Sequence, residues 1–128
     1  MIVIDASAVI SALLNEGPAR QLMGRQRLHV PSLIDTEVAS ALRRQVLAGT
    51  LSAEHGWTAL NTWQRLAVLR YPTHGLLDRI WQLRHNVSAY DATYVALAEG
   101  LGCSLATLDG RLARGSSEFT CPVTVLPV

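Results

Sequence analysis

The stretch "IVIDASAVISALLNE", residues 2–16, joins a short β-branched run to a segment of helical period through a single acid. Isoleucine and valine at 2–4 favour a strand, and the apolar spacing over about 7–15 favours a helix. A strand followed by a helix is the repeating unit of a parallel sheet, and ligand crevices form at the carboxyl ends of such strands. Asp5 occupies one of these ends, so the first strand already indicates where a site should lie.

The same alternation of short apolar runs and helical segments continues along the chain. The further strand candidates are 28–30, 67–71, 103–107 and 123–127, and the further helix candidates are about 18–25, 33–48, 52–66, 74–85, 89–101 and a short helix after 109. We therefore predict an α/β protein, a three-layer α/β/α sandwich around a parallel sheet. Only the stretch GTLS joins helices 33–48 and 52–66, so they should form an antiparallel hairpin that protrudes from the sheet.

Length and composition favour one domain over residues 1–128. The chain has 128 residues, 49% of them hydrophobic, and a net charge of +1, which points to no particular partner. Its apolar start lacks a basic region, and no run of about 18 apolar residues occurs, so neither a secretory signal nor a membrane span is expected. Cys103 and Cys121 match neither a metal-ligand spacing nor a disulfide framework, which favours the cytoplasm.

Four acids stand at special places in this predicted fold. Asp5 follows the strand 2–4 and Asp109 follows the strand 103–107, and these strand ends are neighbours if the sheet doubles back beside its first strand. Glu37 lies at the border of the inner face of helix 33–48. Asp91 shares an apolar stripe with Val95 at the first turn of helix 89–101. The four side chains are therefore candidates for one shared pocket.

Each acid alone also has an ordinary structural explanation. Ser88 and Asp91 fit a capping box, Asp5 can cap the first helix, and Asp109 can cap the segment GRLARG. Glu37 alone can be a solvated helix residue. The coincidence of all four, and not any one of them, favours a functional site.

Electrostatics decides what such a pocket needs. Two carboxylates about 4 Å apart repel each other by roughly 4 kcal/mol at an effective dielectric constant near 20, so four ionised ones require protons or cations. An all-oxygen ligand set suits Mg²⁺ or Mn²⁺ better than Zn²⁺. Such ions polarise phosphoryl oxygens and lower the pKa of a bound water molecule, which is the equipment for phosphodiester hydrolysis.

Four segments in order resemble the PIN-domain nucleases, and most of all the VapC toxins of VapBC toxin–antitoxin modules. They are "IVIDASAVISALLNE", "PSLIDTEVASALRR", "SAYDATYVALAEGLG" and "LATLDGRLAR". The resemblance runs over essentially the whole chain. It implies a sheet of five parallel strands and a Mg²⁺- or Mn²⁺-dependent endoribonuclease. It further implies a homodimer held inactive by a VapB-like antitoxin.

The resemblance also assigns roles to individual residues. Asp5, Glu37, Asp91 and Asp109 match the acidic quartet that serves as catalytic and metal-binding residues. Supporting hydroxyl positions are matched by Ser7 and Thr107, and Asn86 matches a frequent polar neighbour of the site.

Basic residues and aromatic residues suggest surfaces for partners. Without the quartet, six acids face 11 arginines, a balance of +5, and Lys is absent. Guanidinium groups suit phosphate oxygens, and the arginines that follow two site segments are candidate RNA contacts. These are Arg43, Arg44, Arg111 and Arg114.

Trp57 and Trp63 on helix 52–66 either pack inside the hairpin or offer a docking surface for an antitoxin segment, and the sequence leaves both open.

Several other function classes fit the sequence less well. Receiver-like phosphotransfer domains depend on a Lys, which is absent. Haloacid dehalogenase-type phosphatases carry Asp-x-Asp after the first strand, where this chain has Asp5-Ala-Ser7. A non-catalytic binding domain with a decayed site should have lost an acid. A PIN-domain RNA-processing nuclease without an antitoxin stays open, because the sequence does not show its neighbours in the genome.

Overall fold

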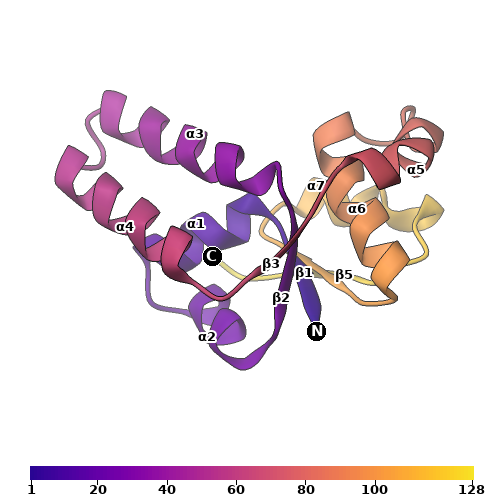
Figure 1. Cartoon of the computed structure of the whole chain (residues 1–128), viewed down its shortest axis with the longest axis horizontal. Helices are drawn as coiled ribbons and strands as arrows, with labels where there is room; N and C mark the ends of the chain where they lie inside the picture. Colours follow the sequence, from indigo (N-terminus) through magenta and orange to yellow (C-terminus); the bar gives the residue numbers. More distant parts are fainter.

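The computed structural model describes residues 1–128 and places a five-stranded parallel sheet between helices (Figure 1). The strands are β1 (Ile2–Ile4), β2 (Leu28–Pro31), β3 (Leu69–Tyr71), β4 (Leu105–Thr107) and β5 (Val123–Val125). They pair in the order β3-β2-β1-β4-β5, and every pair is parallel. The chain therefore builds outward from β1 to one side and then returns to its other side with β4. This is the doubling back that brings Asp5 and Asp109 to adjacent strand ends.

Helices cover both faces of the sheet, as the predicted three-layer sandwich requires. The helices are α1 (Ala6–Leu14), α2 (Pro18–Arg25), α3 (Ile34–Leu47), α4 (Ala53–Arg65), α5 (Leu77–Gln82), α6 (Ala89–Leu101) and α7 (Gly110–Arg114). In Figure 1, α1 to α4 lie on one side of the sheet, and α5 and α6 lie on the other. Pro18 opens α2 at a position where its missing N–H costs nothing, and Gly102 ends α6 with a left-handed φ of 66°.

The α3–α4 hairpin projects beyond the sheet, as expected from its short connection (Figure 1). Its two helices are tied to the edge strand β3 through Asp35. This carboxylate accepts a hydrogen bond from the Trp63 indole at 2.7 Å and two from the Arg70 guanidinium at 2.7 and 3.0 Å. Trp63 is 1% exposed, whereas Trp57 is 59% exposed. The two tryptophans therefore differ in role, because only Trp63 packs inside the hairpin.

The prediction of one helix over 74–85 is wrong in part. A 3-10 turn covers His74–Leu76, the α-helix covers only Leu77–Gln82, and turns follow up to residue 86. The Leu83 amide is shared between the carbonyls of Arg79 and Ile80, and the Leu83 carbonyl accepts from Asn86. These bonds tighten the last turn before the chain enters α6. The predicted strands 67–71, 103–107 and 123–127 are likewise shorter in the structure.

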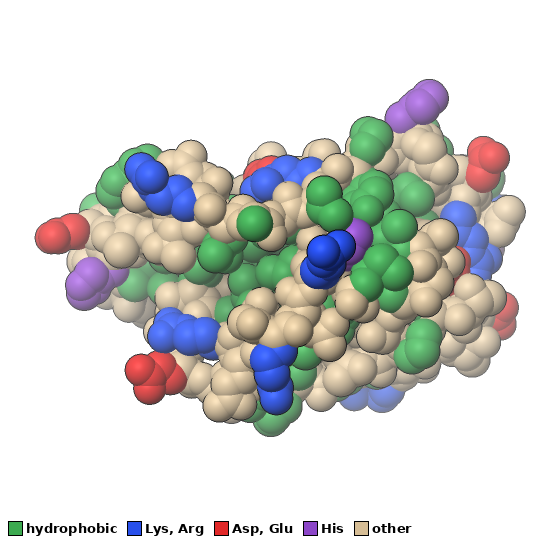
Figure 2. All heavy atoms as spheres, turned by 60° about the horizontal axis from the view of Figure 1, so that its bottom comes forward, with side chains coloured by type: hydrophobic (Ala, Val, Ile, Leu, Met, Phe, Trp, Pro, Cys, Tyr) green, Lys and Arg blue, Asp and Glu red, His purple; other side chains and the backbone are tan.

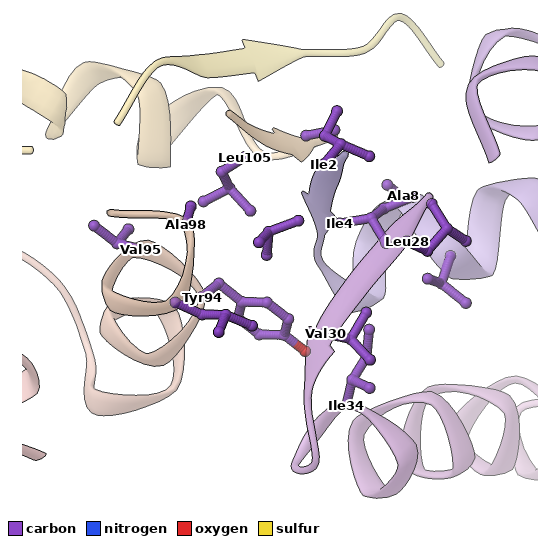
Figure 3. Close-up of a cluster of buried hydrophobic side chains, with 14 of the residues drawn as sticks. Ile2, Ile4, Ala8, Leu28, Val30, Ile34, Tyr94, Val95, Ala98 and Leu105 are labelled. Carbon is purple, nitrogen blue, oxygen red and sulfur yellow. The ribbon is translucent and has the colours of Figure 1, made fainter. Parts of the chain in front are cut away.

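The core fills the space between the sheet and its two helical layers. Figure 3 shows part of it, with side chains of β1, β2 and β4 meeting those of α1, α3 and α6. Trp63 and Tyr94 are the largest side chains that are fully buried. No helix of the chain combines the length and the apolar character that crossing a bilayer requires.

Candidate active site

Asp5 and Asp109 lie at the carboxyl ends of the two central strands. Ile4 of β1 pairs with Ala106 of β4, so the residues that follow these strands emerge side by side. Asp5 caps α1 by accepting from the Ala8 amide at 3.1 Å, and Asp109 caps α7 by accepting from the Arg111 amide at 2.9 Å. Both carboxylates therefore cap helices, and in each of them the bond to the helix amide uses only one of the two oxygens.

Two hydroxyl groups connect the strand ends. Ser7 donates to Asp5 at 2.6 Å and accepts from the Leu108 amide at 3.0 Å. Thr107 donates to the second oxygen of Asp5 and accepts from the Asp109 amide at 2.9 Å. Both predicted supporting hydroxyls thus contact Asp5, and each also fixes the turn that carries Asp109.

Glu37 reaches this edge from α3 and is held by a residue that sequence reasoning missed. The Tyr94 hydroxyl of α6 donates to Glu37 at 2.5 Å. Figure 3 shows the Tyr94 ring extending from α6 toward β2 and the start of α3. In the sequence Tyr94 is indistinguishable from its apolar neighbours on α6, which are core residues. Its only signal was its position three residues after Asp91, on the same face of the helix.

Asp91 occupies the first turn of α6 and is half-buried. Ser88 caps this helix by accepting from the Asp91 amide at 3.2 Å. The reciprocal bond of a capping box, from the Ser88 amide to the Asp91 carboxylate, is not formed. The Asp91 carboxylate interacts instead with the Ser88 side chain and with the charges of Asp109, Asp5 and Arg111.

Burial and mutual repulsion raise the pKa of three of the four acids. Burial is the largest cause for Asp5, Glu37 and Asp91, and hydrogen bonds only partly offset it. Repulsion adds to it, because Asp5 and Asp91 act on Glu37, while Asp109 acts on Asp5 and Asp91. The pKa of Asp109 is lowered instead, chiefly by its hydrogen bond from Arg111. The charges of the four acids thus act on one another, and a bound cation would offset their repulsion.

The donor set at this edge consists of carboxylates and hydroxyls, which are the ligands that Mg²⁺ and Mn²⁺ prefer. As the side chains stand, no group of three or more His, Cys, Asp or Glu residues is arranged to hold one metal ion. The chemistry and the electrostatics of the four acids therefore fit a hard divalent cation, and side-chain rotation would have to complete its ligand set.

The remaining predicted site residues lie at different distances from the acids. Asn86 is exposed, and its backbone amide donates to the Leu83 carbonyl. The structure shows no hydrogen bond between Asn86 and the four acids. Arg111 is paired with Asp109 at 3.3 Å and is otherwise exposed. Arg114 acts on Asp109 only through its charge, and Arg44 acts on Glu37 in the same way. Arg43 is exposed and does not line the hollow beside the acids.

A hollow of about 640 Å³ opens beside the acids. Its walls come from α1, α3 and the start of α6, and they include Glu37, Arg44, Tyr90 and the Asp5 partner Ser7. A second hollow of about 490 Å³ lies between α1, α2, α4 and the first residue of β2. It contains no acid and sits toward the opposite ends of the strands, so it is not part of this site.

The face of the molecule that Figure 2 shows has no acidic side chain at its centre. Figure 2 turns the bottom of Figure 1 forward and shows hydrophobic side chains gathered near the centre of this face, with Arg side chains around them. Acidic side chains lie only toward its margins. The four acids at the carboxyl edge of the sheet therefore differ from the arrangement of acids on the face in Figure 2.

Comparison with known proteins agrees with the fold. The PIN domain family model matches residues 2–117, a range that contains all four acids. Ribonuclease VapC9 of Mycobacterium tuberculosis is 58% identical over 127 residues, which cover 99% of each chain. PAE2754 from Pyrobaculum aerophilum superposes with a TM-score of 0.70 at 22% identity, covering 95% of this chain and 81% of that one. VapC20 of M. tuberculosis, a Sarcin-Ricin loop cleaving toxin, gives 0.68 at 21% identity, covering 99% and 100%.

Proposed function

Because the chain belongs to the PIN-domain family and matches a VapC ribonuclease along nearly its full length, we propose that it is a metal-dependent endoribonuclease. The observation that supports this proposal is electrostatic: repulsion from other members of the quartet helps to raise the pKa of Asp5, Glu37 and Asp91. Mg²⁺ or Mn²⁺ held there would supply Lewis-acid polarisation of a phosphodiester and activation of water.

In this proposal the four acids bind the cation and two arginines bind the RNA phosphates. Asp5 is the most buried of the four acids and has both oxygens fixed by hydroxyl donors, so it would anchor a cation. Glu37, fixed by Tyr94, faces it from α3, and Asp91 and Asp109 complete the pocket from α6 and the end of β4. Arg44 and Arg111 flank these acids and would hold the phosphates of the RNA strand.

The test is RNA cleavage by the parent chain and by Asp5→Asn, each with and without Mg²⁺ or Mn²⁺. The parent should cleave only with the cation, and a chelator should stop it. The variant should lose more than about 100-fold in rate, since even outer partners of metal ligands cost 10- to 100-fold. Asp78→Asn, an exposed acid on α5, is the matched control and should cleave as the parent does. Parental cleavage by Asp5→Asn would remove Asp5 from the active site.

We further propose that the protein acts as the toxin of a type II toxin–antitoxin system in the cytoplasm. Its partners would then be a VapB-like antitoxin and a second copy of itself. Expression alone and together with the neighbouring open reading frame tests this role. Growth arrest that the neighbour relieves supports the toxin, whereas growth unaffected by either supports an RNA-processing nuclease without an antitoxin.

A further inference from the structure

The hollow beside the acids has three chemically different walls. Residues of α3 at spacings of three, four and seven line one wall, so they share a single helix face. They run from Glu37 through Ser40 and Ala41 to Arg44. Ala6, Ser7 and Ile10 of α1 line the second wall, and Tyr90 of α6 forms the third. The hollow thus offers an acid at one end, a cation at the other, and an aromatic ring between helices.

Tyr90 is a large side chain with little protein around it. It is 65% exposed, although its neighbours in α6 from Ala92 to Ala98 are all buried. Single exposed aromatic residues are ordinary on protein surfaces and need no ligand to explain them. Tyr90 differs because it borders the hollow that also holds Glu37 and Arg44, and because it directly precedes Asp91 in the chain.

Arg44 shows which part of a ligand this hollow would accommodate. It lies seven residues after Glu37 on α3, which corresponds to about 10 Å along the helix axis. The Arg44 guanidinium acts on Glu37 through its charge and lines the same hollow. It can therefore pair with a phosphate of a strand that passes the acids. A single strand with its backbone on Arg44 would present its bases to the other walls, where the Tyr90 ring lies.

We propose that Tyr90 is a stacking platform for one base of single-stranded RNA, next to the phosphodiester that is cleaved. This proposal rests on the proposed function and names the substrate contact at the same site. A phenol ring binds the face of any base, so Tyr90 contributes affinity and strand position without selecting a sequence. Arg44 supplies the phosphate contact of the same nucleotide segment, and it is therefore the arginine of the Arg43–Arg44 pair that faces substrate.

The experiment measures RNA binding in an Asp5→Asn background, using a fluorescein-labelled single-stranded oligoribonucleotide with Mg²⁺ present. Tyr90→Ala should weaken binding by about 5- to 150-fold, whereas Tyr90→Phe should bind as the parent background does, because stacking uses the ring. An abasic ribose-phosphate oligomer should bind equally to Tyr90→Ala and to the background. Trp57→Ala removes a similarly exposed ring outside the hollow and should leave RNA binding unchanged.

Salt dependence separates the stacking contact from the phosphate contact. Tyr90→Ala should leave the slope of log affinity against log salt unchanged, while Arg44→Ala should reduce it by about 0.7 and Arg43→Ala should not. Equal binding of RNA by Tyr90→Ala and the background overturns the proposal. So does a loss of dimers in Tyr90→Ala without a loss of RNA affinity, which would make Tyr90 a contact between copies. Cleavage by the parent chain is scored separately, and a parent that neither binds nor cleaves RNA overturns both proposals.

Discussion

At the scale of single residues, capping and catalysis use the same side chains. Asp5 caps α1 with one oxygen, and both of its oxygens accept hydroxyl donors, so its rotamer is fixed before any substrate arrives. The ordinary explanation of each acid as a cap is therefore correct for Asp5 and Asp109 without competing with the functional one. A cap fixes a carboxylate at a helix start, so Asp5 and Asp109 are held in place, whereas side-chain rotation would have to complete the ligand set of a cation.

Tyr94 is a positioning residue for Glu37, and Tyr94→Phe tests this role. Removing the hydroxyl leaves Glu37 free to rotate, so we expect a loss of about 10- to 100-fold in Mn²⁺ affinity or cleavage rate. Calorimetric titration with Mn²⁺ measures the affinity directly.

A matched control for Tyr94→Phe is Tyr71→Phe. The Tyr71 hydroxyl is bonded to His29 at 2.7 Å in the sheet and has no contact with the acids. Tyr71→Phe should therefore affect stability alone and leave Mn²⁺ affinity unchanged. Equal Mn²⁺ affinity in Tyr94→Phe and the parent would mean that the Tyr94 hydroxyl serves only the core.

At the scale of elements, the position of α3 determines where Glu37 stands. The hairpin contacts the rest of the fold through α1, through the pair of Asp35 with Arg70 of β3, and through the bond from Tyr94 of α6 to Glu37. The bond from Trp63 to Asp35 joins its two helices to each other. Burial alone would raise the pKa of Asp35, but the hydrogen bonds from Arg70 and Trp63 outweigh it and lower the pKa. The link therefore stabilises the fold while Asp35 is ionised.

Asp35→Ala should lower the free energy of unfolding by about 1–3 kcal/mol, because the buried Trp63 indole N–H loses its acceptor. Arg70→Ala should cost less than about 1 kcal/mol, since that ion pair is partly exposed. Urea denaturation measures both. The lowered pKa means that the Asp35 contribution is complete above the usual value of 3.8 and disappears as the pH falls through the lowered one. A difference between parent and Asp35→Ala that persists unchanged in acid would contradict this account.

The elements themselves were predictable where a local pattern encodes them. The apolar period located every helix of the two main layers, and short apolar runs located every strand. Strand ends and the segment 74–85 were misjudged, because hydrogen bonds around Leu83 and pairing with neighbouring strands set those boundaries. Tertiary contacts decide such ends, and the local sequence does not contain them.

At the scale of the whole molecule, the roles of the four acids and of the supporting hydroxyls stay predictions, and the sequence did not indicate that Tyr94 contacts Glu37. Tyr94 meets Glu37 over 57 positions of sequence, and Thr107 meets Asp5 over 102. The latter pair follows from strand order, because β1 and β4 are neighbours in the sheet, which the sequence predicted only if the sheet doubles back. The former depends on how α6 packs across the sheet, which no spacing in the sequence expresses. The hollow beside Tyr90 is a product of the same packing.

The central claim is that Asp5, Glu37, Asp91 and Asp109 hold one divalent cation site together. The anomalous signal of a crystal soaked in Mn²⁺ tests it most directly, because it locates the ion without reference to activity. The account predicts a peak at the carboxyl edge of β1 and β4, with a carboxylate oxygen of Asp5 and one of another quartet acid about 2.0–2.6 Å away. Peaks found only at acids outside the quartet, or no peak at saturating Mn²⁺, would contradict it.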